Sequence, residues 1–302
     1  MTSSDSPAIE LIGLTKIFGE VKAVDALSLV VPRGTTLGLI GPNGAGKSTT
    51  IRTLMGLSTV SYGTVRVLGL DPAVDAPQIK SRVGYVPETH LMYRWMRIQD
   101  VIWFAKSFYP TWNDKLCRDL INLFGLAPRQ KIKQLSKGTL AKVSLLLAIA
   151  HEPELLILDE PMSGLDPLAR EEILDGVLRT TGERQCSVLF SSHSLGDVQR
   201  MADNVAMLYE GKLLLHCPVD ELLTSAKRVR AVLRDGCVPV WRPPEAIWQC
   251  VERREWQLTL HPCSEQLLAR LQTEFPVDNV EVTDLSLEDL FKDYVKGRRK
   301  LA

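Results

Sequence analysis

The chain has 302 residues, of which 45% are hydrophobic and 24% are charged, and its 36 Lys and Arg residues balance its 36 Asp and Glu residues. This composition is typical of a globular protein, and the length allows one large domain with a smaller appendage. The zero net charge excludes the bulk basic character expected of a nucleic-acid-binding protein.

The sequence carries no signal for secretion, disulfide formation or membrane insertion. The polar start MTSSDSP is unlike a signal peptide, and the six cysteines form no CxxC pair, which favours reduced thiols in the cytosol. The most apolar stretch, residues 143–150, is far shorter than the roughly 18 residues that a membrane-spanning helix needs. We therefore expect a cytoplasmic chain that does not cross a membrane alone.

The first half of the chain begins with strands and continues with a helical insert. Apolar and β-branched patterns predict strands at residues 9–16, 21–31, 35–40, 64–68 and 83–86. A helical pattern follows the third strand, to about Leu57. From Glu88 to His151 apolar residues recur at helical spacing, which predicts a largely helical insert.

The second half returns to an alternation of strand and helix. The apolar run 155–158 predicts a strand buried on both faces, as in a parallel sheet. The further predicted elements are helices at 168–181 and 195–202, a strand at 187–191, and a hairpin of strands 205–209 and 212–216. This alternation is typical of an α/β domain.

The pattern of residues in the sequence changes after about residue 225. A Pro-rich interruption at 241–248 precedes predicted strands at 256–260 and 280–282 on either side of a helix at 265–273, and Ser286 is expected to cap a last helix. We place the main domain at 1–224 and an α+β appendage at 225–302. The appendage is compatible with three roles: support for dimerisation, regulation of the main domain, or capping of its sheet.

A glycine-rich segment follows the third predicted strand and opens the next helix. Residues 41–48, GPNGAGKS, fit the phosphate-loop pattern G-x-x-x-x-G-K-[ST]. Glycines let backbone N–H groups approach phosphate oxygens, helped by the helix N-terminus. Lys47 is expected to reach the terminal phosphates and Ser48 to help hold Mg²⁺. The candidate ATP-binding residues here are Gly41, Pro42, Asn43, Gly44, Ala45, Gly46, Lys47, Ser48 and Thr49.

Two carboxylates end the buried strand 155–158. Ligands bind at the carboxyl ends of the strands in parallel sheets, so Asp159 and Glu160 are expected beside the phosphate loop. Asp159 would orient Mg²⁺ through water, and Glu160 would polarise the attacking water as a general base. The phosphate loop and an acidic strand end about 110 residues later together predict nucleotide hydrolysis.

Four further segments together resemble the nucleotide-binding domain of ABC (ATP-binding cassette) ATPases. They are residues 135–139 (LSKGT) for the LSGGQ signature, 163–166 (SGLD) for the D-loop, 191–193 (SSH) for the switch histidine, and 86–88 (VPE) at the Q-loop. Their order and spacing resemble the family over roughly residues 8–222. The resemblance implies a P-loop α/β core with an antiparallel β subdomain and a helical subdomain at about 88–151, followed by the α+β appendage.

The resemblance also implies a mechanism in which ATP lies between two cassettes packed head to tail. Phe18 would stack on adenine, and Ser136 and Gly138 of one subunit would contact the γ-phosphate held by the other. Asp166 would belong to the D-loop, and His193 would hold the attacking water. The catalytic candidates are Glu160 and His193. The metal-ligand candidates are Ser48, Glu88 and Asp159.

Three features resemble the bacterial exporter ATPases that handle drugs, antibiotics, lipids or polysaccharides. In the signature, Lys137 replaces a glycine and Thr139 replaces glutamine, whereas the two phosphate-facing positions are kept. Glu88 stands where the family usually has glutamine, and residues 284–291 (DLSLEDLF) are similar to the tail of those ATPases. The resemblance thus implies the ATP-hydrolysing subunit of an exporter.

The partner implied by the resemblance is a separate transmembrane permease subunit that docks on the helical insert. Tyr93, Arg94 and Trp95 are the preferred docking residues, although aromatic residues of the insert could instead fill its core. The second cassette could be an identical or a different subunit. We expect a peripheral location on the cytoplasmic face of the inner or plasma membrane.

Two alternatives remain beside the exporter subunit. A soluble ABC ATPase acting on nucleic acid or ribosomes usually has paired cassettes, coiled-coil insertions or zinc fingers, whereas this sequence has one cassette and neither feature. We therefore expect no nucleic-acid partner. A degenerate regulatory partner in a heterodimer is disfavoured because Glu160 and His193 are both present.

Overall fold

The computed structural model describes residues 6–184, 186–234, 241 and 243–299, and its contacts divide the chain into two units. The first unit is Met1–His216 and the second is Cys217–Ala302. The division falls eight residues before the predicted boundary at 224/225. Helix α8 (Val219–Ser225) is therefore grouped with the second unit, where Cys263 N donates a hydrogen bond to Ser225 O at its end.

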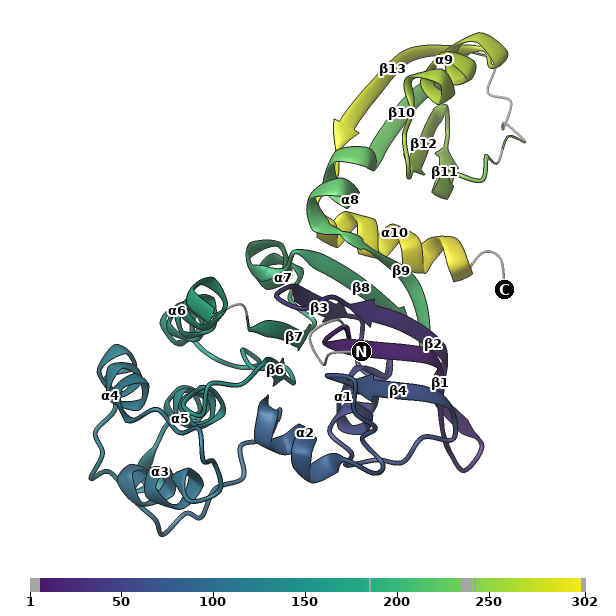
Figure 1. Cartoon of the computed structure of the whole chain (residues 1–302). Coiled ribbons are helices and arrows are strands. Elements are labelled where there is room, and N and C mark those ends of the chain that lie inside the picture. Colours follow the sequence, from purple (N-terminus) through teal and green to yellow (C-terminus); the bar gives the residue numbers. More distant parts are fainter. Residues whose placement is uncertain (1–5, 185, 235–240, 242, 300–302) are drawn as a thin grey trace. The chain divides into compact units, whose positions relative to one another are not determined.

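A six-stranded sheet with parallel pairs organises the first unit (Figure 1). Its strand order is β5 (Val83–Val86), β6 (Leu155–Leu158), β7 (Ser187–Ser192), β3 (Thr36–Ile40), β8 (Asn204–Tyr209) and β9 (Lys212–Pro218). β3, β6 and β7 are buried at every residue, as their nearly continuous apolar sequences require in a parallel sheet. Because β6 and β3 both pair with β7 in parallel, the carboxyl ends of the three strands share one edge.

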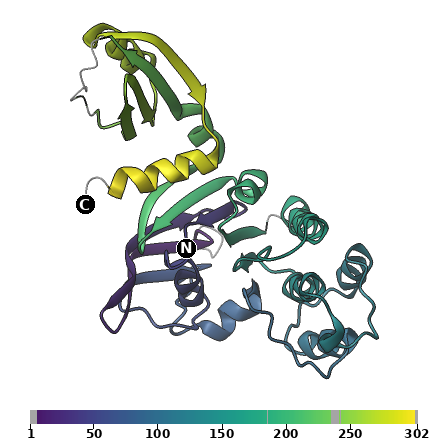
Figure 2. The same ribbon diagram turned by 180° about the vertical axis from the view of Figure 1, so that it is seen from behind.

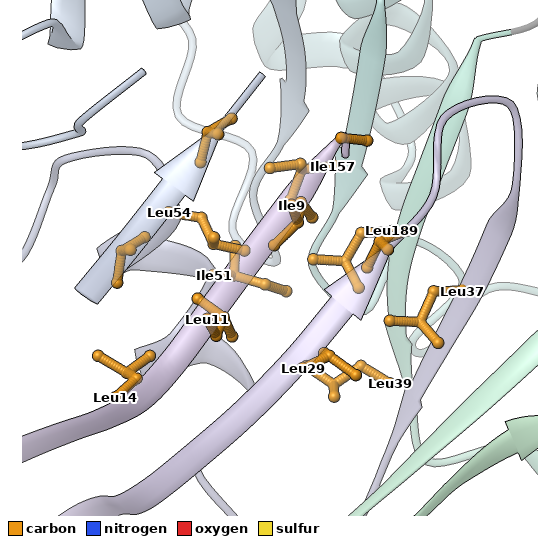
Figure 3. Packing of buried hydrophobic residues seen from close by; sticks show 14 of the residues in the cluster. Ile9, Leu11, Leu14, Leu29, Leu37, Leu39, Ile51, Leu54, Ile157 and Leu189 are labelled. Carbon is orange, nitrogen blue, oxygen red and sulfur yellow. The ribbon is translucent and has the colours of Figure 1, made fainter. Parts of the chain in front are cut away.

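A second, antiparallel sheet confirms the β subdomain. It consists of β2 (Val21–Val31), β1 (Ile9–Phe18) and β4 (Tyr62–Val67), in that order. Its inward side chains and those of the parallel sheet share one hydrophobic core with helix α1 (Lys47–Leu54). Figure 3 shows Leu29 of the antiparallel sheet beside Leu39 of β3, and Leu11 of the same sheet beside Ile51 of α1. This core fixes the start of α1, and hence the phosphate loop, between the two sheets.

The predicted helical insert contains three α-helices: α3 (Ile98–Lys106), α4 (Asp114–Leu123) and α5 (Lys137–Ile149). In Figures 1 and 2 they gather beyond the β5–β6 end of the parallel sheet. The short helix η1 (Ile132–Gln134) precedes α5, and α6 (Pro167–Arg184) and α7 (Leu195–Met201) follow in the chain. The sequence did not predict α2 (Ala76–Arg82), a seven-residue helix with Pro77 in its first turn.

The second unit is an α+β unit, as predicted. Its antiparallel sheet has the order β11 (Ala246–Glu252), β12 (Glu255–Leu260), β10 (Lys227–Leu233) and β13 (Val277–Asp284). Helix α9 (Glu265–Glu274) supplies Leu267 and Leu271 to a core around Trp256. The predicted Ser286 cap of α10 (Leu287–Arg299) is confirmed, because Asp289 N donates to Ser286 Oγ at 3.1 Å. β10 and β11 were not predicted from the sequence.

Candidate functional site

The phosphate loop lies between β3 and α1, where the backbone requires glycine at several positions. Gly44 and Gly46 have φ values of 81° and 101°, in the left-handed region that favours glycine. A Cβ on Gly41 would lie 2.4 Å from Leu208 O, so a side chain there would clash with the backbone of β8. Lys47 is buried and its Nζ donates to Gly41 O at 2.7 Å, which folds the lysine back along the loop.

Asp159 lies at the end of β6 and has two hydroxyl partners. Its Oδ1 accepts hydrogen bonds from Ser48 Oγ at 3.0 Å and from Ser191 Oγ at 2.8 Å. Ser191 Oγ also accepts a hydrogen bond from Glu160 N at 2.8 Å, which joins the ends of β6 and β7. The sequence indicated Ser191 only as part of a motif, whereas the structure places it at the centre of this network. An oxygen-rich group of this kind suits a hard cation such as Mg²⁺.

Glu160 is held between a lysine and a histidine. Its Oε1 lies 3.2 Å from Lys47 Nζ, and its Oε2 lies 2.7 Å from Nδ1 of His193, whose side chain is half exposed. The Glu160 side chain itself is 9% exposed, and its φ of 50° is uncommon for a residue other than glycine. Backbone strain of this kind is typical of functional sites.

The phosphate loop, Glu160 and His193 line a pocket of about 810 Å³, whereas Gly41 and Asp159 lie outside its lining. Its lining residues are Val21, Lys22, Ala23, residues 42–49, Glu88, Glu160, Ser163, His193 and Glu210. Lys22 and Glu210 were not among the predicted site residues. The predicted turn at Glu210-Gly211 was the available signal, because Gly211 N donates to Ala45 O at 3.2 Å and so ties this hairpin to the phosphate loop.

Phe18 lies at the end of β1, outside the residues that line the pocket. Its side chain is 54% exposed, and Lys16 Nζ lies 4.8 Å from the centre of its ring. In the register of β1 and β2, Phe18 faces Val21, which does line the pocket. The structure therefore places an accessible aromatic ring next to the pocket.

The signature and the D-loop of the same chain pack against each other. Ser136 is exposed and caps α5, where its Oγ accepts from Thr139 N at 3.1 Å. A Cβ on Gly138 would lie 3.0 Å from Ala169 Cβ, and Lys137 Nζ lies 2.7 Å from where Gly164 would carry a Cβ.

Asp166 caps the helix that follows the D-loop. Its Oδ1 accepts from Ala169 N at 3.0 Å, and this backbone hydrogen bond is the main cause of the lowered pKa of Asp166. Ser136, Gly138 and Asp166 all lie outside the residues that line the pocket of their own chain.

A second, apolar hollow of about 450 Å³ lies between β5 and the helical insert; we call it the groove. Its lining residues are Met55, Leu57, Lys80, Val83, Tyr85, Pro87, His90–Tyr93, Met96, Val101, Phe104, Ala105, Phe108, Tyr109, Ser144, Leu147 and Ala148. Of the predicted docking residues, Tyr93 lines the groove, and the Trp95 ring lies 6.0 Å from the Tyr93 ring. Arg94 is exposed beside them.

The alternative that the aromatic residues of the insert fill its core is wrong for most of them. The exposed ones are Tyr93, Trp95, Trp103, Phe104 and Phe108, whereas Tyr109 and Trp112 are half-buried. Such a concentration of exposed aromatic side chains is typical of an interaction surface.

Comparisons with known proteins agree with this geometry. A family model described as ABC transporter matches residues 24–163. The uncharacterized ABC transporter ATP-binding protein YhaQ of Bacillus subtilis is 31% identical, over 93% of this chain and 96% of that protein. The match with YhaQ therefore extends into the second unit. The bacitracin transport ATP-binding protein BcrA of Bacillus licheniformis is 32% identical over 72% of each chain.

Solved structures share the fold of the first unit. A structure described as the ATP-binding subunit of an ABC transporter has a TM-score of 0.66 and 28% identity, and the match covers 71% of this chain and 91% of that chain. An ATP-binding cassette described as a dimer bound to ADP and Pi has a TM-score of 0.63 at 19% identity, over 70% of this chain and 98% of that chain. The P-loop core with its added subdomains is therefore the fold of these proteins.

Proposed function

The chain belongs to the family of ABC transporter ATP-binding proteins, and from this premise we propose that it powers an exporter whose membrane-spanning subunit is a separate chain. As a member of this family it is an ATP-hydrolysing subunit of a transporter. The hydrolytic part of this proposal is carried by one observation: Glu160 lies between Lys47 and His193 at the wall of a pocket that the phosphate loop lines.

ATP would bind with its phosphates on the loop 41–49. The N–H groups at the start of α1 and the Lys47 ammonium would attract the phosphate oxygens. Phe18, beside the pocket, would stack on the adenine. Lys47 Nζ lies 3.2 Å from Glu160 Oε1, so phosphates that attract Lys47 would weaken this pair and free the carboxylate.

Hydrolysis would use the freed Glu160 as the general base. The oxygen of a water attacks the γ-phosphorus, the bond from the γ-phosphorus to the bridging oxygen of ADP breaks, and Glu160 accepts the proton of the water. His193, which contacts Glu160 at 2.7 Å, would hold the water and the γ-phosphate. Both side chains line the same pocket.

Mg²⁺ fits the oxygen groups at the end of β6. Asp159 is buried and its partners Ser48 and Ser191 are neutral hydroxyls, so its charge remains available for a cation. Ser48, Asp159 and Glu88 would hold the ion; Ser48 and Glu88 line the pocket, and Ser48 Oγ donates a hydrogen bond to Asp159 Oδ1. When bound, Mg²⁺ neutralises charge on the β- and γ-phosphates.

The signature would act on the ATP of a second cassette, identical or different. Ser136 is exposed at the first turn of α5 and lies outside its own pocket, as a residue that serves another subunit must. Ser136 and Gly138 would offer a hydroxyl and a backbone N–H to that γ-phosphate. Asp166 would lie at the same dimer interface, because the D-loop packs on the signature. ATP would thereby join two cassettes, and hydrolysis would release them.

The groove and its exposed aromatic side chains would receive the permease. None of the helices in the described part of the chain combines the length and apolar character needed to cross a bilayer. A docking segment with an apolar face fits a groove lined mainly by apolar side chains. The chain would then lie at the cytoplasmic face of the membrane.

The direction of transport is inferred from likeness to related ATPases. The similarity to a protein named for bacitracin transport, together with Glu88 and the LSKGT signature, supports export of a drug or antibiotic.

Two measurements on the Glu160→Gln protein test this function: an ATPase assay, and size-exclusion chromatography with and without Mg-ATP. We expect ATP hydrolysis to fall by about 10² to 10⁴-fold, because the general base is lost, and the protein to shift from monomer to dimer on ATP. The control is the double variant Lys47→Ala/Glu160→Gln, which should remain monomeric because it no longer holds the phosphates. Turnover of Glu160→Gln at the parent rate would refute the general-base assignment, and an ATP-bound monomer would refute dimerisation by this chain alone.

A further inference from the structure

One polar contact crosses the wall of the apolar groove. Ser144 Oγ and His90 Nδ1 lie 3.0 Å apart, and both residues line the groove. Ser144 belongs to α5 and is 7% exposed, whereas His90 belongs to the segment between β5 and α3 and is half-buried. The contact therefore joins two different elements across 54 residues of chain.

The contact satisfies a polar group in the groove wall. The Ser144 hydroxyl can donate a hydrogen bond to His90 Nδ1, so a buried hydroxyl finds a partner on a neighbouring segment. Removing either side chain would leave the other polar group in the groove wall without this partner, and that loss carries a desolvation cost.

Each partner is connected to a group that faces nucleotide in the proposed function. His90 follows Glu88 by two residues, and Glu88 lines the nucleotide pocket. Ser144 lies eight residues after Ser136, about 12 Å along the same helix at the usual rise. Most residues of α5 are buried, among them Gly138, Ala141 and Leu145, so one continuous packed helix connects Ser136 with Ser144.

We propose that the hydrogen bond between His90 and Ser144 is a positioning contact that holds the Glu88 segment against α5, so that Glu88 and Ser136 keep one fixed relation during ATP-driven dimerisation. This inference rests on the proposed function, because only there do Glu88 and Ser136 face two different ATP molecules. Since both side chains line the groove, a docked segment of the permease would touch this contact directly.

The test uses the Glu160→Gln protein and measures two quantities. The first is the affinity for a fluorescent ATP analogue at a protein concentration too low for dimers. The second is the Mg-ATP concentration that gives half dimer, measured by analytical ultracentrifugation. His90→Ala and Ser144→Ala should each raise the Mg-ATP concentration for half dimer by about fivefold, which corresponds to the loss of one hydrogen bond. The affinity of the monomer for the ATP analogue should change by less than about twofold. The double variant should need no more Mg-ATP for half dimer than the single variants, because the same contact is lost in each case.

Two further variants separate positioning from simple destabilisation. His90→Asn should restore dimerisation, because its amide reaches the place of Nδ1, whereas His90→Gln should not. Asn113→Ala removes the cap of α4 in the same helical insert and should lower the melting temperature without changing dimerisation. If the alanine variants do not fold, the Asn and Gln variants at position 90 answer the same question.

Each result decides for or against the contact. Unchanged dimerisation in the single variants, or additive losses in the double variant, would overturn the inference and leave the proposed function standing. A Glu160→Gln parent that binds ATP and stays monomeric would overturn both. Rescue by Asn but not by Gln, with ATP affinity of the monomer unchanged, would establish the positioning role.

Discussion

Each unit of the molecule buries an aspartate, and the two differ in their partners. Asp159 in the first unit and Asp293 in the second are both 2% exposed. Asp159 ends β6 and accepts hydrogen bonds from the hydroxyls of Ser48 and Ser191. Asp293 lies in α10, where it forms an ion pair with Arg228 and accepts from Thr259 Oγ1 at 2.6 Å.

The two aspartates differ in whether a partner neutralises the negative charge of the carboxylate. Hydroxyl partners satisfy the hydrogen-bonding capacity of Asp159 without neutralising it, so the carboxylate retains a charge that a cation can bind. Arg228 neutralises Asp293 and, with Thr259, ties α10 to β10 and β12. A buried carboxylate with neutral partners beside a pocket therefore indicates a ligand site, whereas one paired with arginine indicates a structural contact.

The largest expected effects come from the same isosteric change at both aspartates. Asp293→Asn should destabilise the second unit by about 3 kcal/mol, because it leaves Arg228, whose side chain is only 16% exposed, without its counter-charge. Asp159→Asn should leave stability unchanged or slightly higher and reduce Mg-ATP hydrolysis by more than about 100-fold, because it removes a buried charge that serves the cation. Urea unfolding, followed by tryptophan fluorescence, measures the stability of each variant. An ATPase assay measures its rate of ATP hydrolysis.

A surface ion pair supplies the control for this comparison. Asp278→Asn breaks the exposed pair of Asp278 with Arg234 and should cost less than about 1 kcal/mol. Equal destabilisation by Asp159→Asn and Asp293→Asn would contradict the distinction between the two aspartates. So would a loss of ATP hydrolysis in folded Asp293→Asn.

A smaller effect is expected at the exposed ring of Phe18. Phe18→Ala should weaken ATP binding by about tenfold through the loss of stacking on adenine, whereas Phe18→Tyr should retain it. Stability should change little, because the side chain is 54% exposed. The control is Tyr62→Ala, which removes a still more exposed ring from β4 of the same sheet. Isothermal titration with ATP measures the affinities, and equal binding by Phe18→Ala and the parent would exclude Phe18 from the site.

The sequence predicted the parts of the site whose chemistry lies in short contiguous segments. The phosphate loop, the carboxylates after 155–158 and the serine that caps α5 each depend on neighbours within a few residues. The parallel pairing of β6 and β3 with β7 then brings the segments together, as the alternation of strand and helix suggested. Local pattern and global fold agree in this unit.

The sequence could not predict contacts that depend on distant pairing. Asp293 resembles an exposed charge in an amphipathic helix, and its partner Arg228 lies 65 residues earlier. The alternation of arginine and apolar residues over 228–231 is a strand signal that could have identified β10, whereas β11 follows a Pro-rich segment. Glu210 lines the pocket beside Gly211, which is tied to the phosphate loop, and Lys22 lines it from the start of β2.

The smallest effect is expected at Glu154, which is charged and paired yet belongs to neither kind of site. Hydrogen bonds from Arg82, with a further contribution from Arg33, lower the pKa of Glu154 from 4.5 to about 2. Because the folded-state pKa is the lower one, the pair stabilises the protein above about pH 4.5, and this contribution is lost as the pH falls towards 2. The side chain is 42% exposed, so solvent screens the interaction.

Glu154→Gln should therefore lower the free energy of unfolding by less than about 1 kcal/mol at pH 7, and the difference from the parent should shrink towards pH 3 and in high salt. Urea unfolding of both proteins at pH 7, 5 and 3, each at low and high salt, measures this. A difference independent of pH would mean that Glu154 contributes by packing and not by its charge. Together with Asp293→Asn, the result would show how much of the value of an ion pair in this chain comes from burial, since both carboxylates are paired with arginine and differ mainly in exposure.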